Sequence, residues 1–291
     1  MTDRRQAVLS VDFELFSHTP AYRQASGTLS DPTVGLAGAE WLRDAFEVAG
    51  ASATWFTVSQ IAANHPEAVR EVVSAGHEIG SHTHTHRLLT ELDGNERTTE
   101  LERSRETLEA VTGEPVAGFR APAFDFGDGH FEALEAAGYD YDSSVVASRS
   151  IPGWYGGEYE LTRPAPATAV QANAPESIGE LPVSVMPGLR LPLTGTWLRF
   201  FGPRYTIYGM KRLADRGIAP VLYVHPWELV DLPALDGVPG RVYWHTGTWM
   251  RRAIRRILQT DFEFVTARTV LESSGIVDET GDSERQKRGG R

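Results

Sequence analysis

Short apolar runs rich in β-forming residues alternate with helical patterns along most of this 291-residue chain. In the helical stretches, apolar residues recur at spacings of three and four, which is typical of amphipathic helices. Strand and helix alternating in this way predict a parallel sheet, either open or closed into a barrel. The expected strands are 7–11, 53–58, 77–80, 118–119, 139–142, 181–185, 221–224 and 262–265, and the expected helices are 39–49, 66–75, 91–111, 129–137, 205–216 and 247–259.

The composition is that of a folded protein with a large core, because 41% of the residues are hydrophobic and 23% are charged. Residues 148–179 are rich in Pro, Gly and Ala without periodicity, and we interpret them as an irregular excursion of the same domain. We therefore expect one catalytic domain over residues 1–275, followed by a polar, disordered tail at residues 276–291.

Charge and residue usage exclude several classes of protein. The net charge of −11 argues against nucleic acid as a partner. The chain has no cysteine, so any metal would need histidine and carboxylate ligands. No apolar run approaches the ~20 residues that span a bilayer, and the run at 7–10 is too short for a signal peptide. We expect a cytoplasmic protein without a transmembrane segment.

Polar side chains of types used in catalysis follow four of the expected strands. Asp12 and Glu14 come after the first run, and histidines come after the third. Arg120 and His225 occupy the equivalent positions after two later runs. The carboxyl ends of parallel strands meet at one rim, and this rim carries the active site in such folds. The sequence therefore predicts one site built from these residues.

Four of the nine histidines lie between residues 77 and 86. On a helix, His82 and His86 would share a face, because residues four apart are neighbours there. On a strand, His82, His84 and His86 would share a face instead. Either geometry could supply two nitrogen ligands to a metal, and a polar loop with solvated histidines is the alternative.

At this point the sequence resembles the polysaccharide deacetylases of the NodB-homology group, a carbohydrate esterase family 4-like family. The resemblance covers about residues 7–270 and implies a distorted (β/α) barrel with fewer than eight strands, related to the TIM barrel. It also implies a metal-dependent amide hydrolase acting on N-acetylated sugars. The motifs that carry the resemblance are Ser10-Val-Asp-Phe-Glu14, His82-Thr-His-Thr-His86, Phe119-Arg-Ala-Pro122 and Leu222-Tyr-Val-His225.

The resemblance also implies a role for each site residue. Glu14, His82 and His86 would hold a divalent metal, zinc before cobalt, nickel or manganese. Asp12 would be the general base, Arg120 would pair with it, and His225 would be the general acid. A backbone N–H near Ala123 would help to stabilise the oxyanion.

Two features depart from the family pattern. The usual adjacent aspartates are replaced by Asp12-Phe13-Glu14, a variant associated with the allantoinase-like and exopolysaccharide branches. This leaves Asp12 as the alternative metal ligand. The family's Asp-x-x-Trp motif, whose aspartate tunes the catalytic histidine, has no clear counterpart. Asp142 is a candidate substitute, or else an ordinary carboxylate at a strand end.

Three functions therefore stay open. The first is deacetylation of an N-acetylated sugar or polysaccharide precursor, either lipid- or nucleotide-linked. The second is an allantoinase-like hydrolysis of a cyclic amide or ureide. The third is glycan binding without catalysis. The basic stretch Arg251–Arg256 is interpreted as a solvated helix face, with an anionic membrane surface as the alternative. Oligomeric state is not predicted.

Overall fold

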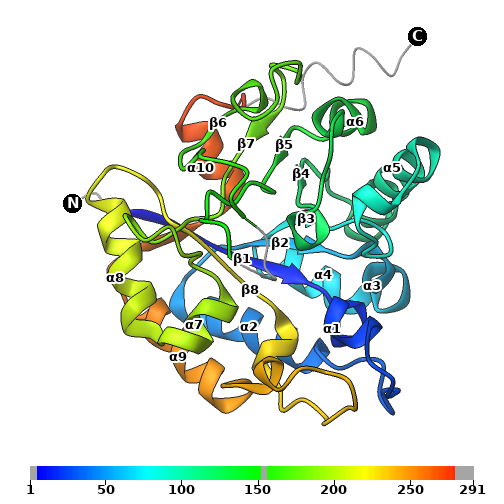
Figure 1. Cartoon of the computed structure of the whole chain (residues 1–291), viewed down its shortest axis with the longest axis vertical. Coiled ribbons are helices and arrows are strands. Elements are labelled where there is room, and N and C mark those ends of the chain that lie inside the picture. The colour runs from blue at the N-terminus through cyan, green and yellow to red at the C-terminus, as the bar shows by residue number, and fades with distance from the viewer. Residues whose placement is uncertain (1–4, 152–155, 279–291) are drawn as a thin grey trace.

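The chain folds around one curled sheet of mainly parallel strands, surrounded by helices (Figure 1). The computed structural model describes residues 5–151 and 156–278. The strands follow the order β6-β7-β5-β4-β3-β2-β1-β8, and β9 pairs with β1 beside this path. They are β1 (Gln6–Phe13), β2 (Thr54–Thr57), β3 (Glu78–Ser81), β4 (Gly118–Phe119), β5 (Tyr141–Asp142), β6 (Ala165–Pro166), β7 (Gly179–Glu180), β8 (Val221–Val224) and β9 (Glu263–Val265).

The first strand, β1, has three neighbours in the sheet. It pairs in parallel with β2, β8 and β9, and every residue after Gln6 is buried. A parallel strand covered on both faces requires a nearly continuous apolar sequence, which residues 7–11 provide. The carboxyl end of β1 consequently lies in the middle of the rim, between the ends of β2 and β8.

The helices pack around the outside of the sheet and end at local sequence signals. α5 begins with a capping box between Asp93 and Glu96, and it ends at Gly113, which has a left-handed φ of 73°. The helices are α1 (Pro20–Arg23), α2 (Leu36–Ala49), α3 (Ser59–Asn64), α4 (Pro66–Ser74), α5 (Gly94–Thr112), α6 (His130–Ala137), α7 (Gly195–Phe201), α8 (Pro203–Ala214), α9 (Thr248–Leu258) and α10 (Ala267–Ser273). Short 3-10 turns that bear on the site are η1 (Phe16–His18), η3 (Pro122–Phe124), η5 (Pro226–Leu229) and η6 (Gly240–Tyr243).

The distorted α/β barrel is confirmed, but its sheet has more strands than expected. β4 and β5 fall within the strands expected at 118–119 and 139–142, whereas β6 and β7 were not predicted, because strands of two residues carry no periodic signal. The strand expected at 181–185 is absent, because pairing in this region is confined to β7 and to isolated bridges at Val183 and Val185. The helices α3, α7 and α10 were not predicted. Residues 279–291 of the expected tail lie outside the described residues.

Within residues 5–151 and 156–278, no helix is both long enough and apolar enough to cross a membrane.

A buried histidine makes the stability of this fold depend on pH. His77 is 6% exposed, stacks on Trp55 and meets the edge of Phe46. Burial, helped by the charge of Arg43, lowers the pKa of His77 to about 4. The unfolded chain, with a histidine pKa of about 6.5, therefore binds more protons than the folded chain between pH 6.5 and 4. Stability present above pH 6.5 is lost as the pH falls through this window.

Between pH 7 and pH 5, the free energy of unfolding of His77→Phe should fall by about 1 to 2 kcal/mol less than that of the original chain, because phenylalanine keeps the ring contacts and cannot be protonated. Urea unfolding of both proteins at several pH values measures the difference. Parallel pH profiles for the two proteins would contradict the assignment.

Candidate active site

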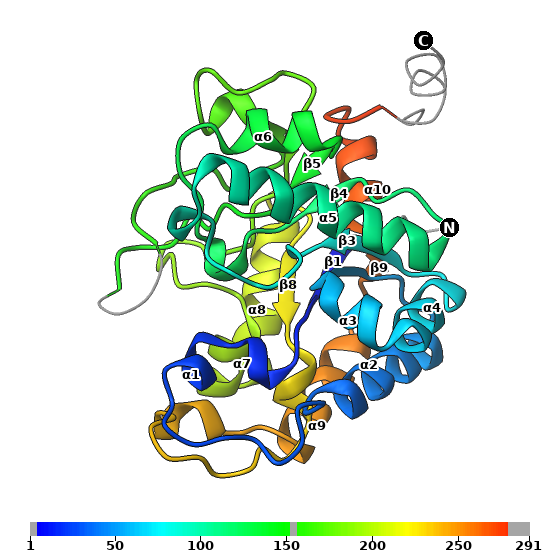
Figure 2. The same ribbon diagram turned by 90° about the vertical axis from the view of Figure 1, so that its right-hand side faces the viewer.

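The polar residues singled out in the sequence lie at the carboxyl ends of neighbouring parallel strands. β1, β3, β4 and β8 run in the same direction, so their ends open on one side of the sheet. Figure 2 shows the arrow of β8 pointing toward the end of the molecule where α1 and α7 lie. The structure thus brings together the residues that follow these four strands.

A carboxylate and two imidazoles converge at this rim. Ligand atoms of Glu14, His82 and His86 lie within 4.8 Å of one another, and all three side chains are buried. Glu14 Oε2 is 2.6 Å from His86 Nε2, and Glu14 Oε1 accepts a hydrogen bond from the indole N–H of Trp227 at 2.9 Å. The chain turns directly after β1, where the N–H of Glu14 donates to the carbonyl of Asp12. This turn carries the longer glutamate side chain into the cluster.

The histidine segment is neither helix nor strand. β3 ends at Ser81, and the backbone then takes left-handed φ values of 64° at Thr83 and 59° at His86. The hydroxyl of Thr83 accepts the N–H of His86 and closes the loop. His82 and His86 meet because of this loop, whereas His84 turns away and contacts the hydroxyl of Ser59 at 2.8 Å. Nδ1 of His82 lies 2.7 Å from the carbonyl of Arg120, which assigns the proton to Nδ1 and leaves Nε2 as the ligand atom.

Asp12 is held by a buried arginine. Nη1 of Arg120 donates to Asp12 Oδ1 at 2.6 Å and to the hydroxyl of Ser10 at 3.0 Å. The rest of the guanidinium donates to the carbonyl and the hydroxyl of Ser143, and it lies 4.2 Å from the ring centroid of Phe56. Arg120 has no exposed surface, so its orientation is fixed on every side.

His225 joins the cluster from β8. Its Nε2 is 3.8 Å from Glu14 Oε1, and its Nδ1 is 3.3 Å from Glu228 Oε2. Glu228 also accepts the backbone N–H of His225, and its other oxygen pairs with Arg199 at 2.8 Å. Glu228 and Arg199 were not predicted as site residues from the sequence, although Glu228 belongs to the segment His225-Pro-Trp-Glu228.

Asp142 is not the residue that tunes His225. Its carboxylate faces Nε2 of His130 at 3.1 Å and accepts the hydroxyl of Ser144 at 2.6 Å. Asp142 is the last residue of β5, and four strands, β4, β3, β2 and β1, separate β5 from β8, which carries His225. The carboxylate that contacts His225 is that of Glu228 instead.

Burial and neighbouring charges set the protonation of the cluster. Burial alone would raise the pKa of Glu14, but the imidazoles around it, first of all His86, hold it well below its ordinary value. Burial lowers the pKa of His82 to about 4, against the charge of Asp12, so this ring is neutral at pH 7. His225 differs, because Glu228 and Glu14 outweigh its burial and raise its pKa to about 9.

The turn η5 is seated on α2 at Gly38. A Cβ at this position would overlap the carbonyl oxygen of Pro226. We expect Gly38→Ala to cost about 1–3 kcal/mol of stability and to lower turnover, because the turn that carries His225 must shift. Thermal unfolding and a turnover assay measure the two effects. Gly94→Ala is the matched control, because a Cβ there has no atom within 4 Å. Equal behaviour of the two variants would contradict the prediction.

Ala123 lies in η3, next to the Arg120 segment. It is exposed and has a left-handed φ of 52°. Its role as an oxyanion donor stays a prediction.

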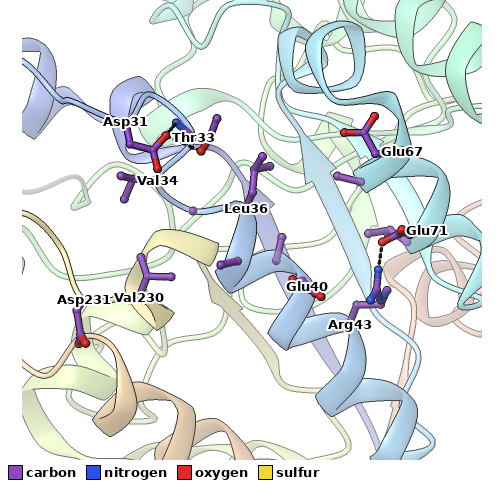
Figure 3. Close-up of a pocket in the computed structure, with 15 residues that line it drawn as sticks. Asp31, Thr33, Val34, Leu36, Glu40, Arg43, Glu67, Glu71, Val230 and Asp231 are labelled. Carbon is purple, nitrogen blue, oxygen red and sulfur yellow. Dashed lines mark hydrogen bonds and ion pairs between the residues drawn. The ribbon is translucent and has the colours of Figure 1, made fainter.

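A pocket of about 600 Å³ opens elsewhere, between α2, α4 and the loop before α2. Figure 3 shows the carboxylates of Asp31, Glu40, Glu67 and Asp231 around it, and the ion pair between Arg43 and Glu71. None of the rim residues described above lines it. This pocket is therefore distinct from the candidate site.

Two family models match consecutive parts of the chain. Residues 39–141 match the model for polysaccharide deacetylase, and residues 143–272 match a domain of unknown function (DUF3473). The segment from residue 39 to residue 141 thus belongs to the polysaccharide deacetylase family. The motif residues of β1 and β8 lie on either side of the first match, within one continuous sheet.

Two curated relatives match part of this chain in sequence. It is 29% identical over 100 residues to a peptidoglycan deacetylase of Helicobacter pylori, an alignment covering 34% of each protein. It is 29% identical over 149 residues to the peptidoglycan deacetylase-like protein FGM2 of Gibberella zeae, covering 49% of this chain and 44% of the relative. The chain thus spans less than half of each relative.

Solved structures share the fold over nearly the whole length of this chain. A protein assigned as a polysaccharide deacetylase from Mycobacterium smegmatis has a TM-score of 0.62 at 24% identity, covering 94% of this chain and 91% of that one. PuuE allantoinase has a TM-score of 0.61 at 18% identity, with coverage of 93% and 91%. A CE4 family pseudoenzyme from Bacillus anthracis has a TM-score of 0.52 at 12% identity, with coverage of 93% and 66%.

The donor set of the candidate site fits a divalent metal ion. Glu14 Oε2 is buried and lies 2.6 Å from Nε2 of His86, and ligand atoms of Glu14, His82 and His86 all lie within 4.8 Å of one another. Two imidazoles and one carboxylate, without thiolate, are a donor set that zinc and similar ions accept, and three protein ligands leave a position open. The hydrogen bond from His82 to the Arg120 carbonyl is the kind of outer contact that orients a metal-binding histidine.

Proposed function

We propose that this chain is a metal-dependent hydrolase that removes acetyl groups from N-acetylated sugars. The observation that carries the proposal is the cluster of Glu14, His82 and His86, with His225 3.8 Å from Glu14 and with Asp12, paired to Arg120, two residues before Glu14. Ligands, a proton acceptor and a proton donor are what hydrolysis of an amide requires.

The chain's own residues divide the work between them. A divalent ion held by Glu14, His82 and His86 would supply a Lewis acid for the amide carbonyl and lower the pKa of water. Asp12, held by Arg120, is placed to accept the proton of the attacking water. His225, oriented by Glu228, is placed to give a proton to the leaving nitrogen. A C–O bond forms, the amide C–N bond breaks, and the products are acetate and a free amine.

The substrate class that we propose is a polysaccharide or its precursor, either lipid- or nucleotide-linked. The two curated relatives are named as a peptidoglycan deacetylase and a peptidoglycan deacetylase-like protein, which supports a polymer of N-acetylated sugars.

Acetate release tests the proposal. The purified chain, stripped with chelator, would be supplied separately with zinc, cobalt, nickel or manganese and offered N-acetylglucosamine oligomers and peptidoglycan. We expect acetate and free amine to appear in equal amounts, and only with metal added. Absence of both products with every metal would overturn the proposal.

A cyclic ureide hydrolase is the second candidate, because Asp12-Phe-Glu14 resembles the allantoinase-like variant of the motif. Allantoin offered to the same metal-loaded protein separates the two functions. Turnover of allantoin without acetate release would favour this candidate. Glycan binding by a purified chain that takes up no metal would favour an inactive binding domain instead.

A further inference from the structure

One flank of the molecule is basic, although the whole chain is acidic. The flank consists of α7, α8, α9 and the turn η6 together with Trp244, which directly follows it. Figure 1 shows α7, α8 and α9 next to one another, and α8 contacts both α7 and α9. The sequences of these four elements contain nine basic residues and no acidic residue, in a chain with a net charge of −11. We call this surface the basic flank.

The basic flank also exposes large aromatic side chains. Among the described residues, five large hydrophobic side chains are exposed, and three of them lie here, namely Phe201 (50%), Tyr208 (60%) and Trp244 (57%). Phe201 and Trp244 belong to a continuous set of ring contacts that also includes Trp197 and Phe200. Phe201 stacks on Trp197 at 5.6 Å, and Trp244 meets Phe200 edge-on at 5.6 Å. Exposed apolar surface concentrated in this way marks an interaction site.

Exposed arginines line up with these rings. On α8, Arg204, Tyr208 and Arg212 follow one another at intervals of four, which puts them on one face of the helix. On α9, Arg252 and Arg256 have the same spacing and face solvent, whereas Arg251 and Arg255 lie over the ring of Trp41. No described carboxylate forms an ion pair with Arg204, Arg212, Arg252 or Arg256.

We propose that the basic flank docks on the surface of a negatively charged lipid bilayer. Arginines without carboxylate partners complement anionic headgroups. Phenylalanine, tyrosine and tryptophan beside them suit the boundary between headgroups and acyl chains, where amphipathic rings bind most favourably. Both features coincide on the one flank whose helices and turn carry no acidic residue. The rest of the chain is strongly acidic and would be repelled by the same bilayer, so the charge distribution fixes one orientation.

The docking surface is separate from the candidate active site, although both use α7. Arg199 points inward from this helix and pairs with Glu228, whereas Phe201 at its end is exposed. Substitutions of the exposed side chains therefore test docking without changing any residue of the catalytic cluster. The inference does not depend on the proposed hydrolysis.

Co-sedimentation with vesicles tests this inference on the full chain. Vesicles of phosphatidylcholine alone would be compared with vesicles containing 30% phosphatidylglycerol. We expect binding only to the anionic vesicles, and a steep decrease when the salt concentration is raised. Arg252→Gln with Arg256→Gln should lower the partition coefficient roughly 20-fold. Phe201→Ser with Trp244→Ser should lower it at least about tenfold.

Matched substitutions outside the flank are the controls. Val48→Ser removes an apolar side chain that is 91% exposed on α2, and Arg103→Gln removes an exposed arginine on α5. Both should bind vesicles like the original chain, and circular dichroism checks that all variants are folded. Equal binding to neutral and anionic vesicles, or no loss in the flank variants, would overturn the inference. A dimer in light scattering that the flank variants abolish, without vesicle binding, would assign the flank to a second copy of the chain instead.

Discussion

Glu14→Gln should abolish tight metal binding, whereas Asp12→Asn should leave it intact and still reduce turnover about 10²- to 10⁴-fold. Glu14 lies among the imidazoles of His82 and His86, and glutamine keeps its size but not its charge. Asp12 faces Arg120 instead, so its loss should affect proton transfer rather than metal affinity. We expect the metal affinity of Glu14→Gln to fall by more than about 100-fold, since even an outer-shell partner contributes up to that much.

Metal content by mass spectrometry and affinity by calorimetry, each beside acetate release, separate the two roles. Glu40→Gln, in the pocket away from the rim, is a control that should change neither quantity. If Asp12→Asn loses the metal and Glu14→Gln retains it, the assignment of ligand and base must be exchanged.

Arg120→Met should destabilise the fold by about 3–5 kcal/mol, because it leaves the buried carboxylate of Asp12 without its cation. The same substitution removes the donors to Ser10 and Ser143. Lysine should not rescue it, because one ammonium cannot reproduce the fork that contacts Asp12 and Ser143 together. Urea denaturation of the metal-free chain measures the effect.

A double variant distinguishes the unpaired charge from lost packing. Asp12→Leu combined with Arg120→Met removes both charges, so it should be more stable than Arg120→Met alone. Arg103→Met, on the exposed face of α5, should be nearly neutral. A cost below about 1 kcal/mol for Arg120→Met, or no recovery in the double variant, would contradict the account.

The parts of the fold that were predictable are those with long periodic patterns. β1, β2 and β8 were visible as apolar runs, and α2, α4 and α9 as amphipathic spacings. The two-residue strands β6 and β7 were not recognisable as sheet, because they are too short for a period and exist only through pairing with their neighbours. β4 and β5 are as short, but both fall within the strands expected at 118–119 and 139–142. The short helix α7 was missed for a similar reason.

Site residues were predictable where a side chain of a type used in catalysis stands at the end of an expected strand. Asp12 lies at the carboxyl end of a buried strand, and Glu14, Arg120 and His225 directly follow buried strands, so a parallel sheet was enough to bring them together. The conformation of the histidine loop was not predictable, because left-handed φ values at Thr83 and His86 contradict the usual preferences of these residues. Glu228 was missed because a carboxylate three residues after His225 carries no signal until a 3-10 turn folds it back. Arg199 comes from a distant helix and is recognisable only in three dimensions.

The tetrapeptide from His225 to Glu228 unites tasks that many enzymes distribute over several loops. It contains the proposed proton donor His225, the carboxylate of Glu228 that contacts it, and the indole that donates a hydrogen bond to Glu14. One displacement of this backbone would therefore disable all three together, and no repair at a single side chain would restore them. A substitution that shifts this turn should therefore impair all three functions at once. Transfer of the turn into another barrel should likewise carry all three functions with it.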